Sequence, residues 1–347
     1  MKMNLPVHPK ILITRTDRVG DLVVSTPVFQ ILREQFPQSF ISACVFLEHR
    51  ELMTENPYLN EVILYDKRGR EKNWFGQIQF AQKIKARKFD LVIHLHATNR
   101  MHLMGWLAGI PNRIGYNRRA AWALTQAFPY DKKEGAKHES SYLCDFLGAA
   151  GLLAQPAGSP LPFVPVLVGM QTSVENLLLH HRVGEGAKLA VIHPSASDET
   201  KMWPAAPFAE LIQKLKAAHS DWVWISIGDA KASEQTQKIG RASGAPIINL
   251  CGQLSLGMLA ALFQKAKLVI SNDSGPAHIA AAVGAPTVSI FGRWQPGLNA
   301  ERWRPLGKKT AIVTPQIENI PEAQRKFTYI EEITVPQVLG AVTKVLA

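Results

Sequence analysis

Residues 268–292 read LVISNDSGPAHIAAAVGAPTVSIFG. An apolar run ends at Ser271, a polar turn follows, and Pro276 stands where a helix would begin. Proline is favoured in the first turn of a helix and glycine just after its end, so Pro276 and Gly284 bound a predicted helix. A second apolar run follows at 287–291. Such a strand–helix–strand sequence is typical of a parallel sheet covered by helices.

The same alternation continues along most of the chain. A stretch at 152–168 with four prolines interrupts it, and such a composition is typical of a connection rather than a core element. We therefore expect fold class α/β, with two successive domains. Apolar runs predict strands at 11–14, 40–46, 61–64, 89–94, 188–193, 222–227, 246–249, 267–271 and 287–291.

The composition is that of an ordinary globular protein, with 347 residues, 46% hydrophobic and 19% charged. Its 3 cysteines lie far apart, which argues against a disulfide framework or a zinc knuckle. The first residues lack the apolar core of a signal peptide, and no apolar run reaches the roughly 20 residues of a membrane span. We expect a cytoplasmic protein without a membrane-spanning helix.

The charge is strongly basic, with 39 Lys and Arg against 28 Asp and Glu, a net charge of +11. Residues 1–170 contain 21 Lys and Arg and 14 Asp and Glu, a net charge of +7. This bias fits solvated helix faces and loops. It also fits a face that meets a polyanion, such as nucleic acid, anionic lipid head groups or a phosphorylated glycolipid. Composition alone leaves both interpretations open.

The turn after the strand at 267–271 contains the most informative polar residues. Ser274 or Asp273 can cap the following helix, whose amino end offers backbone N–H groups and a favourable dipole to an anion. Gly275 permits close backbone approach, and His278 in the first turn can donate a charge-assisted bond to a phosphate. The alternative is a well-capped helix that binds nothing.

A second group of polar residues lies in ILITRTDRVGDLVVSTP at 11–27. Asp21 begins a helix here, and it serves either as a favourable charge at the helix end or as a general base. In the second case Arg15 and Arg18 would hold anionic ligands. The glycine patterns of dinucleotide-binding turns and of phosphate-binding P-loops are absent.

The third group follows the strand at 188–193, in VIHPSASDETKMWP at 191–204. The hydroxyls of Ser195 and Ser197, backbone N–H groups and Lys201 would suit a diphosphate. An ordinary loop that caps the next helix explains the same residues. His94 and His96 alternate along a strand and favour a structural or site-lining role over metal binding, and no carboxylate cluster suggests a metal site.

Together these stretches resemble glycosyltransferase family 9, the family of ADP-heptose:lipopolysaccharide heptosyltransferases. The resemblance covers nearly the whole chain. It is carried by ILITRTDRVGDLVVSTPVFQILR (11–33), RIGY (113–116), HPSASDETKMWP (193–204) and NDSGPAHIAAAVGAPTVSIFG (272–292).

The resemblance implies a GT-B architecture, in which two Rossmann-like domains face a central cleft. Residues 1–168 would then bind the acceptor and residues 169–334 the nucleotide-sugar donor. The last helix, 335–347, would pack back on the first domain.

The resemblance also implies roles for single residues. Asp21 matches the catalytic aspartate, and Arg15 the basic residue six positions before it. The loop at 195–200 is one residue longer than in the best-known heptosyltransferases, which leaves its hydroxyl contacts open. The donor-binding residues would be Ser195, Ser197, Lys201, Glu234, Asp273, Ser274, Gly275 and His278, and the acceptor-binding residues Arg15, Arg18 and Arg113.

The activity so implied is inverting transfer of a heptose from ADP-heptose to a lipopolysaccharide inner-core acceptor. Asp21 would be the base, with neither a metal nor a cofactor beyond the donor substrate. The partners would be a lipid A–core glycolipid and the anionic inner face of the inner membrane, and not nucleic acid. One alternative is a family 9 enzyme with another nucleotide sugar or glycan acceptor. A remote one is a basic nucleic-acid-binding protein, although no helix-turn-helix, RNP-like or zinc signature supports it.

Overall fold

The structure, a computed structural model, describes residues 3–153, 160–318, 321 and 328–347. The chain divides into two compact units, unit 1 (Met1–Pro162) and unit 2 (Phe163–Ala347). The division falls slightly before the predicted boundary at 168, because the chain enters unit 2 ahead of its first helix, α7 (Val168–His180). No helix of the described residues is both long and apolar enough to cross a membrane.

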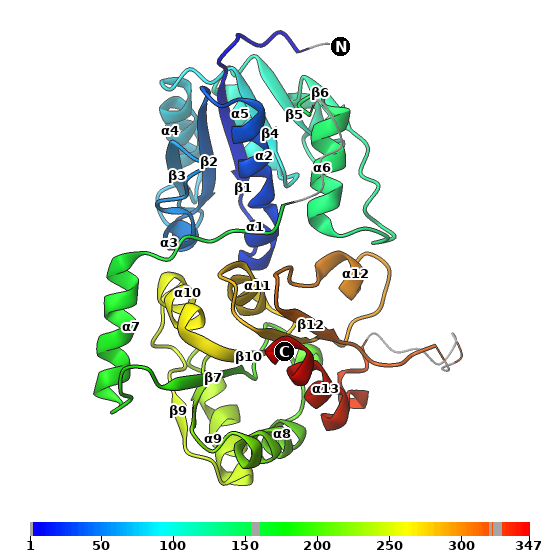
Figure 1. Cartoon of the computed structure of the whole chain (residues 1–347). Helices are drawn as coiled ribbons and strands as arrows, with labels where there is room; N and C mark the ends of the chain where they lie inside the picture. The colour runs from blue at the N-terminus through cyan, green and yellow to red at the C-terminus, as the bar shows by residue number, and fades with distance from the viewer. Residues whose placement is uncertain (1–2, 154–159, 319–320, 322–327) are drawn as a thin grey trace. The chain divides into compact units, whose positions relative to one another are not determined.

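Unit 1 is built on a parallel sheet of six strands in the order β3-β2-β1-β4-β5-β6 (Figure 1). Its central strands β1 and β4 are almost completely buried and read as continuous apolar runs, as helix-covered parallel strands do. The strands are β1 (Lys10–Arg15), β2 (Phe40–Phe46), β3 (Glu61–Tyr65), β4 (Leu91–His94), β5 (Asn112–Tyr116) and β6 (Gln126–Phe128).

The helices of unit 1 connect successive strands, except α6, which follows the last strand. A single helix is expected over 22–36, but the structure has α1 and α2 instead, divided at Thr26. Pro27 explains the break, since proline lacks the N–H that a continuing helix needs. The helices are α1 (Val19–Ser25), α2 (Pro27–Gln35), α3 (Arg50–Met53), α4 (Trp74–Lys85), α5 (Asn99–Leu107) and α6 (Glu139–Ala149), with the short 3-10 helices η1 (Leu47–His49) and η2 (Ala121–Ala123).

Unit 2 repeats the architecture with a parallel sheet in the order β12-β11-β10-β7-β8-β9. Its strands are β7 (Lys188–His193), β8 (Trp222–Ser226), β9 (Ile247–Asn249), β10 (Ala266–Asn272), β11 (Thr287–Ile290) and β12 (Thr310–Val313). Its further helices are α8 (Ala205–Ala218), α9 (Ala232–Ser243), α10 (Leu256–Lys265), α11 (Gly275–Ala282), α12 (Ala300–Trp303) and α13 (Val335–Leu346), with η3 (Glu199–Lys201) and η5 (Ile330–Glu332).

Numbered within its own unit, each sheet has the strand order 3-2-1-4-5-6 of the Rossmann fold. The prediction of two Rossmann-like α/β domains is therefore confirmed. In this topology the chain leaves the first and fourth strands toward opposite sides. A crevice then opens outside their carboxyl ends, where ligands of such sheets bind. These strands are β1 and β4 in unit 1 and β7 and β10 in unit 2.

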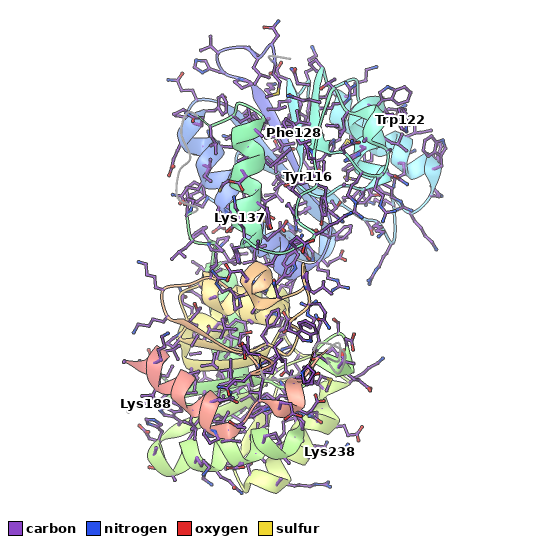
Figure 2. The ribbon with its side chains drawn as sticks, turned by 90° about the vertical axis from the view of Figure 1, so that its right-hand side faces the viewer. Tyr116, Trp122, Phe128, Lys137, Lys188 and Lys238 are labelled. Atoms are coloured by element: carbon purple, nitrogen blue, oxygen red, sulfur yellow. The ribbon has the colours of Figure 1, made fainter. Side chains whose placement is uncertain are left out.

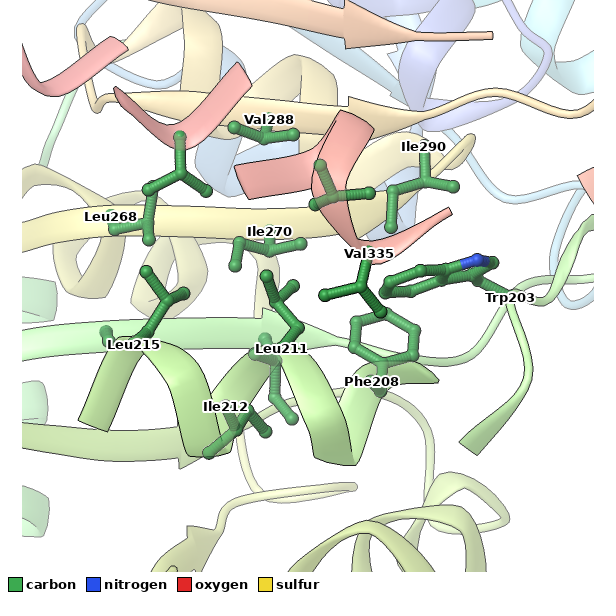
Figure 3. Packing of buried hydrophobic residues seen from close by; sticks show 14 of the residues in the cluster. Trp203, Phe208, Leu211, Ile212, Leu215, Leu268, Ile270, Val288, Ile290 and Val335 are labelled. Carbon is green, nitrogen blue, oxygen red and sulfur yellow. The ribbon is translucent and has the colours of Figure 1, made fainter. Parts of the chain in front are cut away.

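The prediction that the last helix packs back on the first domain is wrong. Helix α13 begins with a capping box, in which Thr334 and Gln337 bond reciprocally. Its buried valines belong to the unit 2 core, together with Phe208 and Leu211 of α8 (Figure 3). The indole of Trp203 in the same core donates to the Ile333 carbonyl at 2.8 Å. An apolar helix face of this kind is stable where it buries most area, here within unit 2.

Candidate functional site

In unit 1 a buried arginine organises the carboxyl end of β1. Arg15 is 3% exposed, and its Nε donates to Asp17 Oδ1 at 3.0 Å. Its Nη1 donates to the Leu95 carbonyl just after β4 at 3.1 Å, and its Nη2 to Asp21 Oδ1 at 3.2 Å. One guanidinium thus joins the ends of the two central strands to the first turn of α1. This is the place where the Rossmann topology opens its crevice.

Asp21 is held by this arginine but remains accessible. It lies in the first turn of α1, where the helix dipole favours a negative charge, and its side chain is 20% exposed. A carboxylate that is oriented by a buried cation and reached by solvent can accept a proton from a bound hydroxyl.

Asp17 also contacts His96. Asp17 Oδ2 lies 3.5 Å from His96 Nδ1. Burial raises the pKa of Asp17 to about 7, although the neighbouring Arg15 works in the opposite direction. Burial, supported by Arg15, lowers the pKa of His96 to about 4. At neutral pH the imidazole is therefore uncharged, and this contact is not an ion pair.

The charge network extends from Arg15 to the amino end of α6. Arg15 Nη1 lies 3.7 Å from Glu139 Oε1, and Glu139 accepts a bond from Lys132 Nζ at 2.7 Å. Both Lys132 and Glu139 are 2% exposed, and the ammonium also lies 4.4 Å from the ring centroid of Tyr116. Sequence reasoning missed Asp17, Lys132 and Glu139. Only the proximity of Asp17 to Asp21 in TDRVGD could have indicated one of them.

The three predicted acceptor-binding arginines are not brought together. Arg15 is buried among protein groups, and Arg18 is exposed at the residue before α1. Arg113 is the second residue of β5, and the strand register places it level with Leu12, toward the amino end of the sheet. Its guanidinium donates to the carbonyls of Ile110 and Ala123. In this position Arg113 supports the β5 region and lies away from Asp21, so its predicted acceptor-binding role gains no support from the structure.

In unit 2 a buried histidine organises the corresponding crevice. His193 ends β7, and its Nε2 lies 3.2 Å from Ser195 Oγ. Its Nδ1 lies 3.0 Å from Ser274 Oγ, beyond the end of β10. Burial lowers the pKa of His193 to about 4, so the ring is neutral at pH 7. The imidazole thereby positions two predicted donor-binding hydroxyls.

Ser274 occupies the predicted N-cap position of α11, but its side chain does not cap the helix. Its hydroxyl bonds to His193 instead, so the first backbone N–H groups of α11 have no side-chain cap. Gly275 is the first residue of this helix. His278 is buried within α11 and Ser197 is exposed in the loop after β7. An uncapped helix amino end is suited to an anion.

Two cations share one carboxylate beside this helix. Lys201 Nζ of η3 lies 3.2 Å from Asp273 Oδ2, and Arg293 Nη2, after β11, donates to the same oxygen. Asp273 is 7% exposed. The group of Lys201, Asp273 and Arg293 carries a net positive charge and suits a diphosphate. Sequence reasoning missed Arg293, which follows the quoted motif by one residue.

A pocket of about 200 Å³ lies in the same crevice, lined in part by His193, Asp229 and Pro276. Gly228 also lines it, and a Cβ there would lie 2.7 Å from Ser195 Oγ, so the close approach requires glycine. Glu234 does not lie in this pocket. Its side chain is 77% exposed and 2.8 Å from Lys238. The prediction that Glu234 contacts the donor lacks support, and Asp229 is the acidic residue that lines the pocket.

Among the described residues no three His, Cys, Asp or Glu side chains are grouped as metal ligands would be. The absence of a metal from the reaction stays a prediction.

Comparisons with known proteins agree with this architecture. The family model described as glycosyltransferase family 9 (heptosyltransferase) matches residues 77–330. Lipopolysaccharide heptosyltransferase 3 of Escherichia coli is 27% identical over 346 residues, which cover 94% of this chain and 96% of the relative.

Two solved structures have the same fold. The glycosyltransferase family 9 protein of Veillonella parvula is 22% identical and superposes with a TM-score of 0.86, covering 100% of this chain and 99% of that one. The ADP-heptose lipopolysaccharide heptosyltransferase II of E. coli is 22% identical, with a TM-score of 0.76 and coverage of 97% and 98%. With its two Rossmann-like units of GT-B type and a family match over most of its length, the chain belongs to glycosyltransferase family 9 and is a glycosyltransferase.

Proposed function

We propose that this enzyme transfers a heptose from ADP-heptose to an inner-core acceptor of lipopolysaccharide, with inversion at the anomeric carbon. Two of the proteins reported above, both from E. coli, are described as lipopolysaccharide heptosyltransferases, and the name of one includes ADP-heptose. The observation that carries the proposal is the arrangement around Arg15, which orients an accessible Asp21 at the crevice of unit 1.

Asp21 is the general base in this proposal. Its carboxylate accepts the proton of an acceptor hydroxyl, whose oxygen forms a bond to the anomeric carbon of the donor. The bond from that carbon to the diphosphate oxygen breaks, and the diphosphate leaves with the electron pair. Attack from the face opposite the leaving group inverts the configuration. Arg18, exposed beside Asp21, would contact anionic groups of the acceptor.

The crevice of unit 2 would bind the donor. Lys201 and Arg293 would stabilise the charge that develops on the leaving diphosphate. The hydroxyls of Ser195, Ser197 and Ser274, together with the Gly275 N–H at the start of α11, would bond its oxygens. His278 belongs to the same helix but is buried, so its part is to support this helix end. These groups would supply the charge stabilisation without a metal.

The acceptor of such a reaction is a lipid A–core glycolipid, so the enzyme would work at the cytoplasmic face of the inner membrane. Its basic composition supports contact with phosphorylated sugars and anionic lipid. The same crevices would also suit a family 9 enzyme with another nucleotide sugar.

Thermal denaturation with ADP-, UDP-, GDP- and dTDP-sugars tests the donor. A ligand at 100 times its Kd stabilises the native state by about 2.7 kcal/mol. We expect ADP-heptose to raise Tm by several degrees and the other sugars by less than one. Stabilisation by a UDP-sugar and not by ADP-heptose would contradict the donor assignment.

The reaction itself is tested by incubating ADP-heptose with a deacylated core acceptor and determining the anomeric configuration of the product by NMR. Inversion is expected. A product with retained configuration would contradict the single displacement.

A further inference from the structure

Unit 1 exposes an unusual number of large aromatic side chains on one pair of helices and the adjoining 3-10 helix. Trp74 and Phe75 in the first turn of α4 are 60% and 68% exposed. Trp106 on α5 is 48% exposed and Trp122 on η2 is 68% exposed. Among the described residues these are all the exposed tryptophans. We call Trp74, Phe75, Trp106 and Trp122 the aromatic surface.

These side chains belong to one continuous region. Trp74 and Leu103 line a pocket of about 140 Å³ between the start of α4 and one face of α5. Trp106 on α5 meets Trp122 edge to face, with ring centroids 5.7 Å apart. Figure 2 shows Trp122 at the outer edge of unit 1, whereas Tyr116 lies inside it. The aromatic surface therefore extends from α4 across α5 to η2.

Exposed cations adjoin this surface, in the turn before α4. The carboxylates of that turn are bonded to backbone N–H groups. Asp66 accepts from Gly69 and Arg70, which lowers its pKa, and the buried Glu71 accepts from the Asp66 N–H. Glu71 is buried and Asp66 is partly exposed, so the positive charges of this turn outnumber the one negative charge that it presents to solvent. Its exposed cations are Lys67, Arg68, Arg70 and Lys72.

The chemistry of this region fits the head-group layer of an anionic bilayer. Indole rings partition into the interfacial region of membranes, where one edge meets acyl chains and the other meets water. Lysine and arginine beside them are attracted to anionic phospholipid, each strengthening binding by about fivefold. No described helix can span a membrane, so such binding would be interfacial. Duplex nucleic acid would suit the cations but would leave the helix-borne Phe75 and the Trp106–Trp122 pair without a partner, because its bases are already stacked on one another.

We propose that the aromatic surface and the Lys67–Lys72 turn dock unit 1 on an anionic phospholipid bilayer. The proposal deepens the proposed function, since it names the part of the enzyme that meets the membrane carrying a lipid-linked acceptor. It assigns these residues no part in binding the reacting sugars.

Co-sedimentation with vesicles tests the docking. The full chain should bind vesicles of phosphatidylglycerol and phosphatidylethanolamine and should bind phosphatidylcholine vesicles far more weakly. The double variant Trp74→Ser, Phe75→Ser should lower the partition coefficient at least tenfold. The double variant Lys67→Glu, Arg68→Glu should lower it at least about twentyfold, as expected for two lost charges.

Matched variants in unit 2 control for composition. Val168→Ser with Leu179→Ser removes exposed apolar side chains, and Lys214→Glu with Lys238→Glu makes the same change of charge. Both should bind within twofold of the unaltered chain. Tryptophan emission should shift to the blue on vesicles, and the shift should diminish in Trp122→Ser, which also reports whether that side chain enters the interface.

Turnover with a deacylated, soluble acceptor separates this proposal from the proposed function. The docking variants should keep that turnover within twofold, which also shows that they fold. Equal vesicle binding by the unaltered chain and by both docking variants would overturn the docking proposal while the transferase activity stood. Binding to random duplex DNA but not to anionic vesicles would overturn it in favour of nucleic acid.

Discussion

The two units have the same strand order but place opposite kinds of side chain at the carboxyl ends of their central strands. In unit 1 the crevice holds the carboxylates of Asp17 and Asp21 around the buried Arg15. In unit 2 the crevice holds hydroxyl groups around a neutral His193. It also holds the cations of Lys201 and Arg293, which both contact the carboxylate of Asp273. The first set is suited to accepting a proton and the second to binding an anion.

This difference shows that the Rossmann topology supplies a place and not a chemistry. Both crevices arise because the chain leaves adjacent parallel strands in opposite directions. The buried residue at the end of the first strand then decides the chemistry. Arginine gathers carboxylates in unit 1, and a neutral imidazole positions hydroxyls in unit 2.

The largest expected effect comes from removing the arginine of unit 1. Arg15→Met leaves Asp17 and Asp21 without the buried cation that binds them, and breaking a buried ion pair lowers stability by about 3–5 kcal/mol. We expect this loss in the free energy of unfolding measured by urea denaturation. Arg18→Met is the matched control, because Arg18 is exposed and should change stability by less than about 0.5 kcal/mol. Equal free energies of unfolding for Arg15→Met and Arg18→Met would show that Arg15 does not organise the crevice.

The next effect concerns the cations of unit 2. Lys201→Met should weaken ADP binding by about 10- to 100-fold, as expected for the loss of one charge-assisted bond. Titration calorimetry with ADP measures the Kd, and Lys214→Met, at an exposed position of α8, controls for the loss of a positive charge. An unchanged Kd would place the diphosphate elsewhere.

A smaller effect concerns pH. Because the pKa of His193 is about 4 in the folded protein and near 6.5 in the unfolded chain, its contribution to stability is present above pH 6.5. That contribution is lost as pH falls from 6.5 toward 4, since only the unfolded chain takes up the proton. His193→Gln should therefore show a shallower loss of unfolding free energy over this range.

The contribution of Asp17 to the free energy of unfolding changes with pH in the opposite sense. Because burial raises its pKa in the folded protein to about 7, this contribution falls as pH rises toward 7. Asp17 is present in both the unaltered chain and His193→Gln, so the difference between their profiles of unfolding free energy against pH reports on His193 alone. Identical profiles would contradict a neutral, buried imidazole at this position.

The smallest expected effect separates the two acidic residues near the donor crevice. Glu234→Gln should change the Kd for ADP by less than about twofold, because this exposed side chain pairs with Lys238 on the surface. Asp229→Asn, which alters the lining of the pocket, should change it by more than about fivefold. A larger effect of Glu234→Gln would restore the role that the sequence predicted for it.

Much of the fold could be predicted from the sequence, because buried parallel strands are apolar runs and the turns between them carry proline and glycine. The strands β5, β6 and β12 were missed. The last two have only 3 and 4 residues, which leave little pattern, and β5 begins with the polar pair Asn112 and Arg113. The position of α13 was also missed. Its valine stripe shows that one face is buried, but not against which unit.

The candidate site was partly predictable for a similar reason. Asp21, Lys201 and Asp273 lie in the segments that follow predicted strands, so their place near a sheet edge could be inferred from local sequence. The distance of Arg113 from Asp21 could not be predicted, because the register of β5 decides which end of the sheet Arg113 reaches. Lys132 and Glu139 come from separate segments, and only the folded chain brings them to Arg15.

The central claim, that Asp21 performs the chemistry while unit 2 binds the donor, is tested most directly by Asp21→Asn. Its kcat and its Kd for ADP should be measured together, with Asp145→Asn as a control, since Asp145 is an exposed aspartate of unit 1. We predict a kcat lower by about 10²- to 10⁴-fold and a Kd for ADP within twofold of the unaltered enzyme. Turnover that survives in Asp21→Asn would contradict the account.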